Sequence, residues 1–230
     1  MIKILVTGGD SRFAQELKKT KSRYKFIFRS KKQLNFLSLK SIEKNIKKFR
    51  PKIILHLAGL SRPMRIHDKM LNKSIDLNII GTANLVKICN KKNKKIIFFS
   101  TSYVYPGTKG KYKENDPLLP WNNYGWSKLG AESAVQMYKN SLIIRACMTE
   151  RPFIHKFAFT NVKSNFVFHD QFTKLFIKVI PYKGIINIGG KSQTIYNFAK
   201  KNNRKIKKKV SKGELPLRMD MNLKKLQSIL

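Results

Sequence analysis

Residues 2–18 read IKILVTGGDSRFAQELK, and this stretch decides the fold. The apolar, β-rich run Ile2–Val6 leads into a glycine-containing turn and then into the helical pattern Gln15–Lys18. A strand, a glycine turn and a helix in this order form the context that a dinucleotide fingerprint requires. Gly8 permits a tight turn, and the backbone amides from Ser11 to Phe13 would face a pyrophosphate at the positive end of the helix dipole. The stretch therefore predicts a nucleotide site made by Thr7, Gly8, Ser11, Arg12 and Phe13.

The residues after the next strand bear on which dinucleotide binds. Lys25–Phe28 is the second β-rich run, and Arg29 and Ser30 follow it directly. An acidic residue at this position would bind a ribose 2′-hydroxyl, whereas an arginine suits a 2′-phosphate. The sequence favours NADP(H), and NAD(H) stays open because Arg29 is also one more cation in a very basic chain.

Further apolar runs repeat the pattern of a strand followed by a helix. The expected strands are Ile53–Leu57, Ile96–Phe99 and Ser141–Arg145, and the expected helices include Ile42–Phe49, capped by Ser41 and closed by Pro51, and Leu77–Asn90. Five strands alternating with helices predict an α/β fold. Specifically, we expect a Rossmann-type, doubly wound parallel sheet with helices on both faces.

The third strand ends in small residues. Leu57, Ala58 and Gly59 stand at its carboxyl end, the edge at which ligands bind in open α/β sheets. We therefore add these three residues to the expected nucleotide site. Asn78, in the following helix, is expected to have a structural role.

Tyr124-Gly125-Trp126-Ser127-Lys128 is the candidate catalytic motif. A tyrosine and a lysine four residues apart lie on one face of a helix. A lysine ammonium beside a phenol would lower the phenol pKa from about 10. Such a phenol can exchange a proton with a carbonyl or alcohol oxygen near neutral pH.

Five motifs in order support a family resemblance over the whole chain. They are Thr7–Ala14, His56–Gly59, Asn78–Thr82, Ser100–Tyr105 and Tyr124–Lys128, followed by Gly184–Gly190 and Thr194–Lys201 as a late strand and helix. The chain resembles the extended short-chain dehydrogenase/reductases of the epimerase/dehydratase superfamily, and within them the dTDP-4-dehydrorhamnose reductases.

The resemblance implies hydride transfer between a nicotinamide and a sugar carbon, with three catalytic residues. Tyr124 would protonate the ketone oxygen, Lys128 would bind the nicotinamide ribose, and Thr101 would hydrogen-bond the substrate oxygen. Ser100 and Ser102 are alternatives to Thr101. Tyr124 and Lys128 thus also belong to the expected cofactor site.

The residues after Thr101 narrow the reaction. Dehydratases of this family place an acidic pair there, whereas this chain has Ser102 and Tyr103. We expect NADP-dependent reduction of a 4-keto-6-deoxy sugar nucleotide, in the synthesis of surface glycans. An epimerase that forms a transient ketone remains an alternative.

The chain after Arg145 is shorter than the substrate domain of the family. We expect a Rossmann domain over residues 1–145 and an abbreviated substrate lobe over 146–230, partly interleaved with the first domain. Asn165–Phe168 is an expected strand, and His169 and Asp170 are expected to cap a helix from Gln171 to Ile180. The candidate substrate residues are Ser102, Tyr103, Arg145 and Arg151, with His155 and Lys156 as further cations near a diphosphate.

Composition sets the remaining expectations. The formal charge of +37 would suit nucleic acid, yet the lysines are spread along the chain and the densest run, Lys205–Lys209, has no interleaved aromatic residues. We therefore expect no nucleic-acid partner. Cys89, Cys147 and four histidines show no metal-ligand spacing, so we expect no metal and a reducing cytoplasm. No apolar run suits a membrane span.

Two other classes of function stay open. A non-catalytic, NADP-binding regulatory protein would explain the short lobe, and a nucleic-acid-associated protein would use the charge. Met137 and Tyr138, at the end of the catalytic helix, are candidates for contact with a second subunit in a homodimer.

Overall fold

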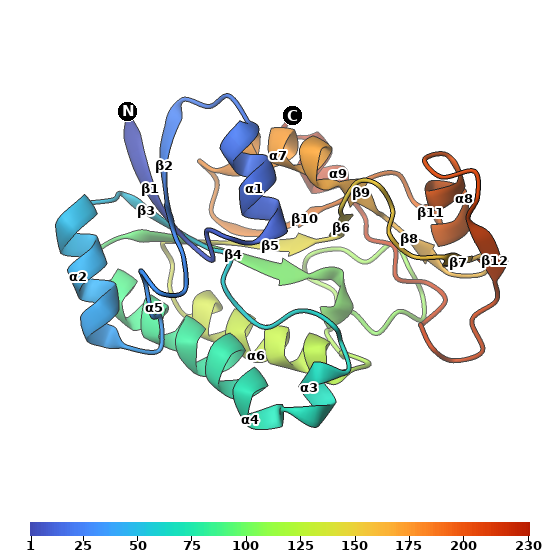
Figure 1. The fold of residues 1–230 in the computed structure, drawn as a ribbon, viewed down its shortest axis with the longest axis horizontal. Coiled ribbons are helices and arrows are strands. Elements are labelled where there is room, and N and C mark those ends of the chain that lie inside the picture. The colour runs from blue at the N-terminus through green and yellow to red at the C-terminus, as the bar shows by residue number, and fades with distance from the viewer.

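The computed structural model describes residues 1–230 and is built on a six-stranded parallel sheet with strand order β10-β5-β4-β3-β1-β2 (Figure 1). Its strands are β1 (Ile2–Thr7), β2 (Tyr24–Arg29), β3 (Ile53–His56), β4 (Lys95–Thr101), β5 (Ser141–Ala146) and β10 (Gly184–Ile188). Each neighbouring pair is parallel, so all six carboxyl ends lie at one edge of the sheet. The predicted α/β fold is confirmed.

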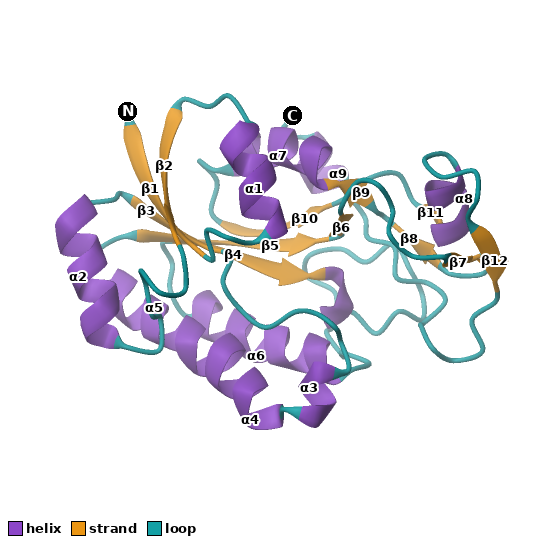
Figure 2. Cartoon of the chain, viewed as in Figure 1, coloured by secondary structure: helices purple, strands orange, loops and turns teal.

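Helices cover both faces of this sheet (Figure 2). One face carries α1 (Arg12–Lys19), α7 (His169–Val179) and the short α9 (Lys224–Gln227). The other carries α2 (Leu39–Phe49), α5 (Gly81–Lys91) and α6 (Asn123–Gln136), with α3 (Ile66–Lys69), α4 (Leu71–Ser74) and the π-helical η1 (Ile75–Ile80) beside α6. The short 3-10 helix η2 (Ser102–Val104) follows β4.

Alternation along the strands divides the core into two layers. Ile4 and Val6 of β1 pack in one hydrophobic cluster with Phe172 and Phe176 of α7. Leu5, between them, packs in the other cluster with residues of α2 and α5. Successive side chains of a strand point to opposite faces, so a strand of continuous apolar residues needs helices on both sides.

The C-terminal part forms a small lobe beside the sheet edge. Its elements are β6 (Met148–Thr149), β7 (Phe157–Phe159), β8 (Lys163–Ser164), β9 (Val167–Phe168), β11 (Gln193–Thr194), α8 (Ile195–Lys200) and β12 (Lys207–Lys209). They pair as three two-stranded sheets around a separate cluster that includes Phe153, Phe168 and Phe198. Yet α7 and β10, from the same half of the chain, belong to the main fold.

Local expectations differ from the structure at three helices. Ser38, not Ser41, caps α2, and its hydroxyl accepts from the Ser41 amide at 3.3 Å. His169 and Asp170 do not cap α7; the helix begins at His169 and has no side-chain cap. The expected helix Leu77–Asn90 is divided between η1 and α5.

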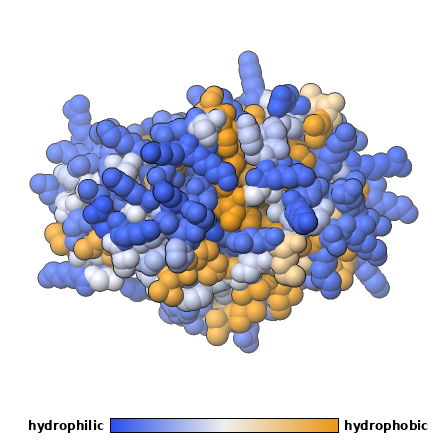
Figure 3. Space-filling view, turned by 180° about the vertical axis from the view of Figure 1, so that it is seen from behind, coloured by the Kyte–Doolittle hydropathy of each residue, from blue (hydrophilic) through white to orange (hydrophobic).

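The surface reflects the unusual charge. Figure 3 shows hydrophilic side chains over most of one face, with an apolar band near its middle and an apolar area at its lower edge. Met70, Leu71 and Ile75, between the end of α3 and the start of η1, are among the exposed large apolar residues of the protein. No helix combines the length and apolar character needed to cross a bilayer.

Candidate active site

The glycine turn after β1 lies directly against the turn after β3. Gly8 has a positive φ of +65°, and a Cβ atom there would lie 2.7 Å from the Ala58 backbone nitrogen. Only glycine allows this approach without strain. The two turns therefore meet where the carboxyl ends of β1 and β3 lie side by side.

The start of α1 is organised as a nucleotide site requires. Ser11 is the N-cap, and its hydroxyl accepts from the Ala14 amide at 3.2 Å. Arg12 is exposed, whereas the Phe13 side chain is 5% exposed and packs against Phe99 and Phe172. Phe13 can offer its backbone amide to a ligand but not its ring.

Thr7 does not face the crevice, which corrects its expected contact with a nucleotide. It is completely buried, its hydroxyl lies 2.7 Å from His56 Nδ1, and it accepts from the Ala58 amide at 3.2 Å. His56 in turn lies 3.0 Å from the Thr82 hydroxyl, so the chain Thr7–His56–Thr82 ties β1, β3 and α5 together.

Arg29 lies beside the glycine turn at the end of β2. Its carbonyl accepts from the Gly9 amide at 2.8 Å, and its guanidinium lies 4.9 Å from the Phe49 ring centre. The buried Arg29 Nε atom has no hydrogen-bond partner. An unpaired guanidinium nitrogen at this place fits a 2′-phosphate. Next to it, the Ser30 amide is taken by Gln33 Oε1.

Tyr124 stands at the start of α6, within a group of aromatic and hydroxyl side chains. Asn122 caps the helix by accepting from the Gly125 amide at 2.7 Å. The Tyr124 ring lies 6.0 Å from the Tyr103 ring and 5.2 Å from the His67 ring. Thr101, 6% exposed, ends β4 and caps η2. The structure therefore brings the ends of β4 and α6 together.

The titration of Tyr124 differs from the expectation. Burial raises the pKa of Tyr124, and the Thr101 hydroxyl and the Arg62 guanidinium oppose this only in part. Burial also lowers the pKa of Lys128 to about 7, against the opposing effect of Glu132. Its ammonium nitrogen lies 4.1 Å from the Phe98 ring centre. The prediction that Lys128 lowers the phenol pKa is wrong here, because the groups that lower the pKa of Tyr124 are Thr101 and Arg62, and burial reduces the charge of Lys128 itself.

A raised phenol pKa has a chemical consequence. Tyr124 keeps its proton at neutral pH, and a protonated phenol is the state that donates a proton. Tyr124 can therefore act as a proton donor to a ligand oxygen, while burial makes it a weaker acid than a free phenol.

Asn78 fastens the loop after β3 to α6. Its side chain exchanges two hydrogen bonds with the backbone of Leu60, at 2.7 and 2.9 Å, and donates to the Ser127 hydroxyl at 2.8 Å. Its role is structural, as expected, and the structure it supports is the wall of the crevice.

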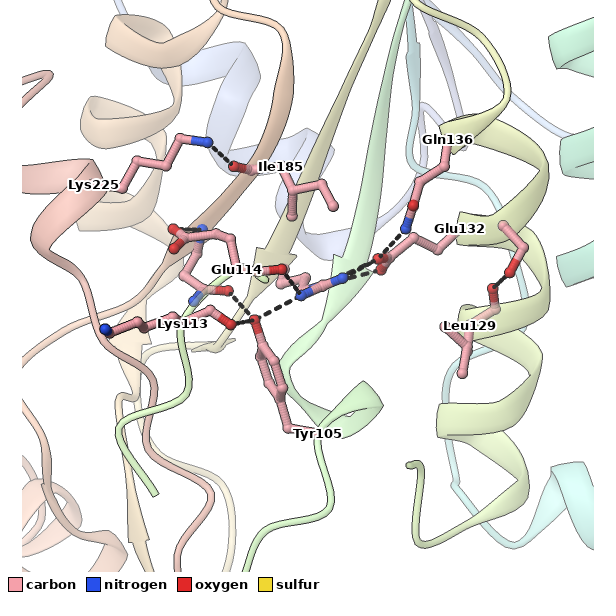
Figure 4. Close-up of polar contacts among 11 residues, drawn as sticks. Tyr105, Lys113, Glu114, Leu129, Glu132, Gln136, Ile185 and Lys225 are labelled. Atoms are coloured by element: carbon pink, nitrogen blue, oxygen red, sulfur yellow. Dashed lines mark hydrogen bonds and ion pairs between the residues drawn. The ribbon is translucent and has the colours of Figure 1, made fainter. Parts of the chain in front are cut away.

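Arg145 does not point toward a ligand, and its expected role at a substrate diphosphate is wrong. It is 1% exposed, and Figure 4 labels its three partners, Tyr105, Glu114 and Glu132. Its guanidinium donates to Glu132 of α6 at 2.5 Å, to the Tyr105 hydroxyl at 2.8 Å and to the Glu114 carbonyl at 2.8 Å. The Arg145 guanidinium therefore holds α6 to β5 through its ion pair with Glu132.

The other expected substrate residues lie in different parts of the fold and differ in exposure. Ser102 is 2% exposed, whereas Tyr103 is half-buried beside Trp121 and Tyr124. Arg151 is exposed and lies 3.9 Å from the Phe168 ring centre, and its Nη1 donates to Asn202 at 3.0 Å. His155 and Lys156 are exposed on the small lobe and line a cavity of about 260 Å³ with Phe153 and Phe157.

Sequence reasoning missed three residues of this region: Arg62, His67 and Glu150. Arg62 and Arg12 both pair with Glu150, and the buried His67 contacts Tyr124 while its Nδ1 lies 2.7 Å from the Ser74 hydroxyl. None belongs to a motif, and no local pattern could have identified them, because their partners lie far away in the chain.

Comparison with known proteins agrees with this geometry. Methionine adenosyltransferase 2 subunit beta of Xenopus laevis is 33% identical over 102 residues, which are 44% of this chain and 30% of that protein. dTDP-4-dehydrorhamnose reductase of Aggregatibacter actinomycetemcomitans is 27% identical over 154 residues, 65% of this chain and 52% of the relative. The chain thus aligns with about a third to about half of the length of these relatives.

A solved structure shares the fold over nearly the whole chain. dTDP-4-dehydrorhamnose reductase of Bacillus anthracis, determined in complex with NADP, superposes with a TM-score of 0.87 at 18% identity, over 99% of this chain and 92% of that one. Residues 2–162 match the family described as the RmlD substrate binding domain, and the chain belongs to this family.

Proposed function

We propose that this protein is an NADP(H)-dependent oxidoreductase that reduces the ketone of a 4-keto-6-deoxy sugar nucleotide in nucleotide-sugar and surface-glycan biosynthesis. The observation that carries the proposal is Tyr124 next to Thr101, in a member of the RmlD family that also has a glycine turn of nucleotide-binding form. The relative named dTDP-4-dehydrorhamnose reductase supports the substrate class.

The residues present fit NADP. Gly8 and Gly59 allow the backbone to pack closely, against Ala58 and against the Asn78 side chain respectively, and Arg29 offers an unpaired guanidinium nitrogen. The Ser11 amide already donates to the Gly8 carbonyl at 2.9 Å and the Ala58 amide to Thr7. The amides of Arg12 and Phe13, with the Ser11, Leu57 and Ala58 surfaces, would hold the rest of the dinucleotide. When bound, the nicotinamide supplies a hydride to the sugar carbon.

Three side chains of the chain would complete the reaction. Tyr124 gives its proton to the ketone oxygen, and the Thr101 hydroxyl and the Arg62 guanidinium make the phenol a better donor because both lower its pKa against the effect of burial. Thr101 hydrogen-bonds the same oxygen and orients it. Lys128 binds the nicotinamide ribose, and Ser102, Tyr103 and Arg151 remain candidate contacts to the substrate.

The division of labour along the chain belongs to the same proposal. Residues 1–145 would bind the dinucleotide and residues 146–230 the sugar nucleotide, although α7 and β10 of the second part complete the main fold. Two buried, unpaired cysteines suit a cytoplasmic protein. Met137, 87% exposed at the end of α6, is the candidate contact in a homodimer.

The first test compares the wild type with Tyr124→Phe in the oxidation of NADPH by a panel of 4-keto-6-deoxy sugar nucleotides. We expect kcat to fall by about 10²- to 10⁴-fold, because the proton donor is removed while the ring remains. The dissociation constant for NADPH should stay within about twofold, since the hydroxyl is not needed to hold the dinucleotide. Equal turnover by both proteins would contradict the assignment of Tyr124.

An epimerase of the same family is the alternative reaction. An epimerase regenerates its nicotinamide in each turnover, so it would interconvert sugar nucleotides with no net loss of NADPH. Product analysis in the same assay distinguishes the two reactions.

A regulatory subunit is the second candidate function. The relative from Xenopus laevis is named as a subunit of methionine adenosyltransferase, so this family includes a protein that works as part of another enzyme. Tight NADPH binding without turnover of any sugar nucleotide would favour this candidate over the reductase.

A further inference from the structure

Three charged side chains from separate segments meet at the start of α1, directly after the glycine turn. Arg12 comes from the start of α1, Arg62 from the loop after β3, and Glu150 from the segment after β6. Glu150 Oε1 lies 2.5 Å from Arg12 Nη1, and both oxygens of Glu150 lie 2.8 Å from Arg62 Nη1. One carboxylate thus links three segments at the start of α1.

The cluster carries an excess of positive charge. Two guanidinium groups share a single carboxylate, and the helix dipole of α1 adds positive potential where Arg12 begins the helix. The Glu150 side chain is only 14% exposed. Burial acts to raise its pKa, but the two arginines and its hydrogen bonds outweigh this and hold the pKa below its ordinary value. Glu150 therefore stays ionised between the two arginines.

Arg62 also acts on the candidate proton donor. Its charge lowers the pKa of Tyr124 and of Tyr103, against the larger effect of burial, which raises both. It also lowers the pKa of His155, and there burial acts in the same direction. These three residues come from α6, from η2 and from the small lobe. Arg62 is exposed, yet its charge reaches titratable groups on three separate parts of the chain.

We propose that Arg12 and Arg62 form a two-armed site for a diphosphate, and that Glu150 is the internal counter-ion that holds both arms in place until a diphosphate replaces it. The inference rests on the proposed function, and it adds Arg62 and Glu150 to that site. Guanidinium groups match the oxygens of carboxylates and of phosphates with the same fork. A diphosphate offers one charged phosphate to each arginine, whereas Glu150 must divide one carboxylate between them.

A diphosphate of this kind has two sources, the dinucleotide and the sugar nucleotide. Calorimetric titration with ADP-ribose represents the first source, and titration with dTDP represents the second. Arg62→Ala is compared with Arg65→Ala, which removes an exposed arginine three residues farther along the same loop. Thermal melting of each variant confirms that it is folded.

We expect Arg62→Ala to weaken the binding of one of the two probes by about tenfold to a hundredfold, the range for a lost charge-assisted hydrogen bond. Arg65→Ala should change neither probe by more than about twofold. The probe that responds identifies the source of the diphosphate. Changes of less than about twofold for both probes in Arg62→Ala, while the wild type binds NADPH, overturn the inference and leave the proposed function intact.

Glu150→Gln tests the counter-ion. Its removal deletes a negative charge next to the incoming phosphates, so the responding probe should bind about three- to tenfold more tightly at low salt. Weaker binding by Glu150→Gln would overturn the role of Glu150 as a replaceable counter-ion. A wild type that binds none of NADPH, ADP-ribose and dTDP would contradict both the inference and the proposed function.

Discussion

At the scale of single residues, burial decides which ionisable groups carry charge. His56 is 1% exposed, with its two ring nitrogens 2.7 and 3.0 Å from the hydroxyls of Thr7 and Thr82. Burial, and to a lesser extent the charge of Lys128, lower the pKa of His56 to about 3. His56 is therefore neutral in the folded protein at any pH at which the protein works, and its role is to join strands rather than to transfer protons.

This neutral histidine predicts acid sensitivity. The pKa of His56 is about 3 when folded and 6.5 in its ordinary state, so between these values the unfolded chain binds the extra proton. The free energy of unfolding should fall as pH drops through this window, by up to about 1.4 kcal/mol per pH unit from this residue. Urea unfolding between pH 7 and 4 should show a shallower slope for His56→Asn.

The exposed His155 supplies the control for this comparison. His155→Asn should change the slope much less than His56→Asn does. Equal slopes in the wild type and in His56→Asn would show that His56 is not kept neutral by the fold.

At the scale of elements, one buried ion pair fixes the helix that carries the candidate motif. Arg145 of β5 and Glu132 of α6 are 1% and 0% exposed, and Arg145 Nη2 lies 2.5 Å from Glu132 Oε1. Glu132 is one turn beyond Lys128 on the same helix, so the pair sets the height of Lys128 and Tyr124 above the sheet edge. Tyr105 and the Glu114 carbonyl satisfy the remaining guanidinium nitrogen.

Removing one charge of this pair should lower the stability of the protein. Glu132→Gln leaves the Arg145 charge buried without a counter-ion, and we expect a loss of about 3–5 kcal/mol in the free energy of unfolding. The double variant Glu132→Leu with Arg145→Met, which removes both charges, should be more stable than Glu132→Gln. Chemical denaturation by urea measures both, and a double variant less stable than Glu132→Gln would contradict this account.

At the scale of the whole molecule, the net charge of +37 acts against the compact state. The protein has 12 acidic side chains to offset its 49 lysines and arginines, and Figure 3 shows hydrophilic side chains over most of one face. Self-repulsion of this kind destabilises a folded chain, and salt screens it, with a Debye length of about 10 Å at 0.1 M and about 3 Å at 1 M.

Added salt should therefore stabilise the protein. Between 0.05 and 0.5 M sodium chloride we expect the free energy of unfolding to rise on the order of 1 kcal/mol, measured with urea because guanidinium is itself a salt. Sodium chloride and potassium chloride should act alike, since screening depends on ionic strength alone. A flat or falling stability would show that the surface charges do not repel one another appreciably.

The architecture could be predicted from local patterns. Apolar runs such as Ile4–Val6 need helices on both faces of their sheet. A strand followed by a glycine turn such as that at Gly8 indicates that a helix comes next. The spacing of Tyr124 and Lys128 on one helix is likewise a local property. These predictions depend on residues a few positions apart, so they could be made from the amino-acid sequence alone.

What the tertiary structure decided depends on burial and on contacts between distant segments. The direction of the Tyr124 pKa follows from its burial, the orientation of Arg145 from Glu132, and the pairing of Arg62 with Glu150 from residues that are 88 positions apart. Ser38 and Ser41 are both residue types that cap helices, and the folded backbone places Ser38 at the cap. Electrostatics in proteins is set by the surroundings of each charge, and those surroundings exist only once the chain has folded.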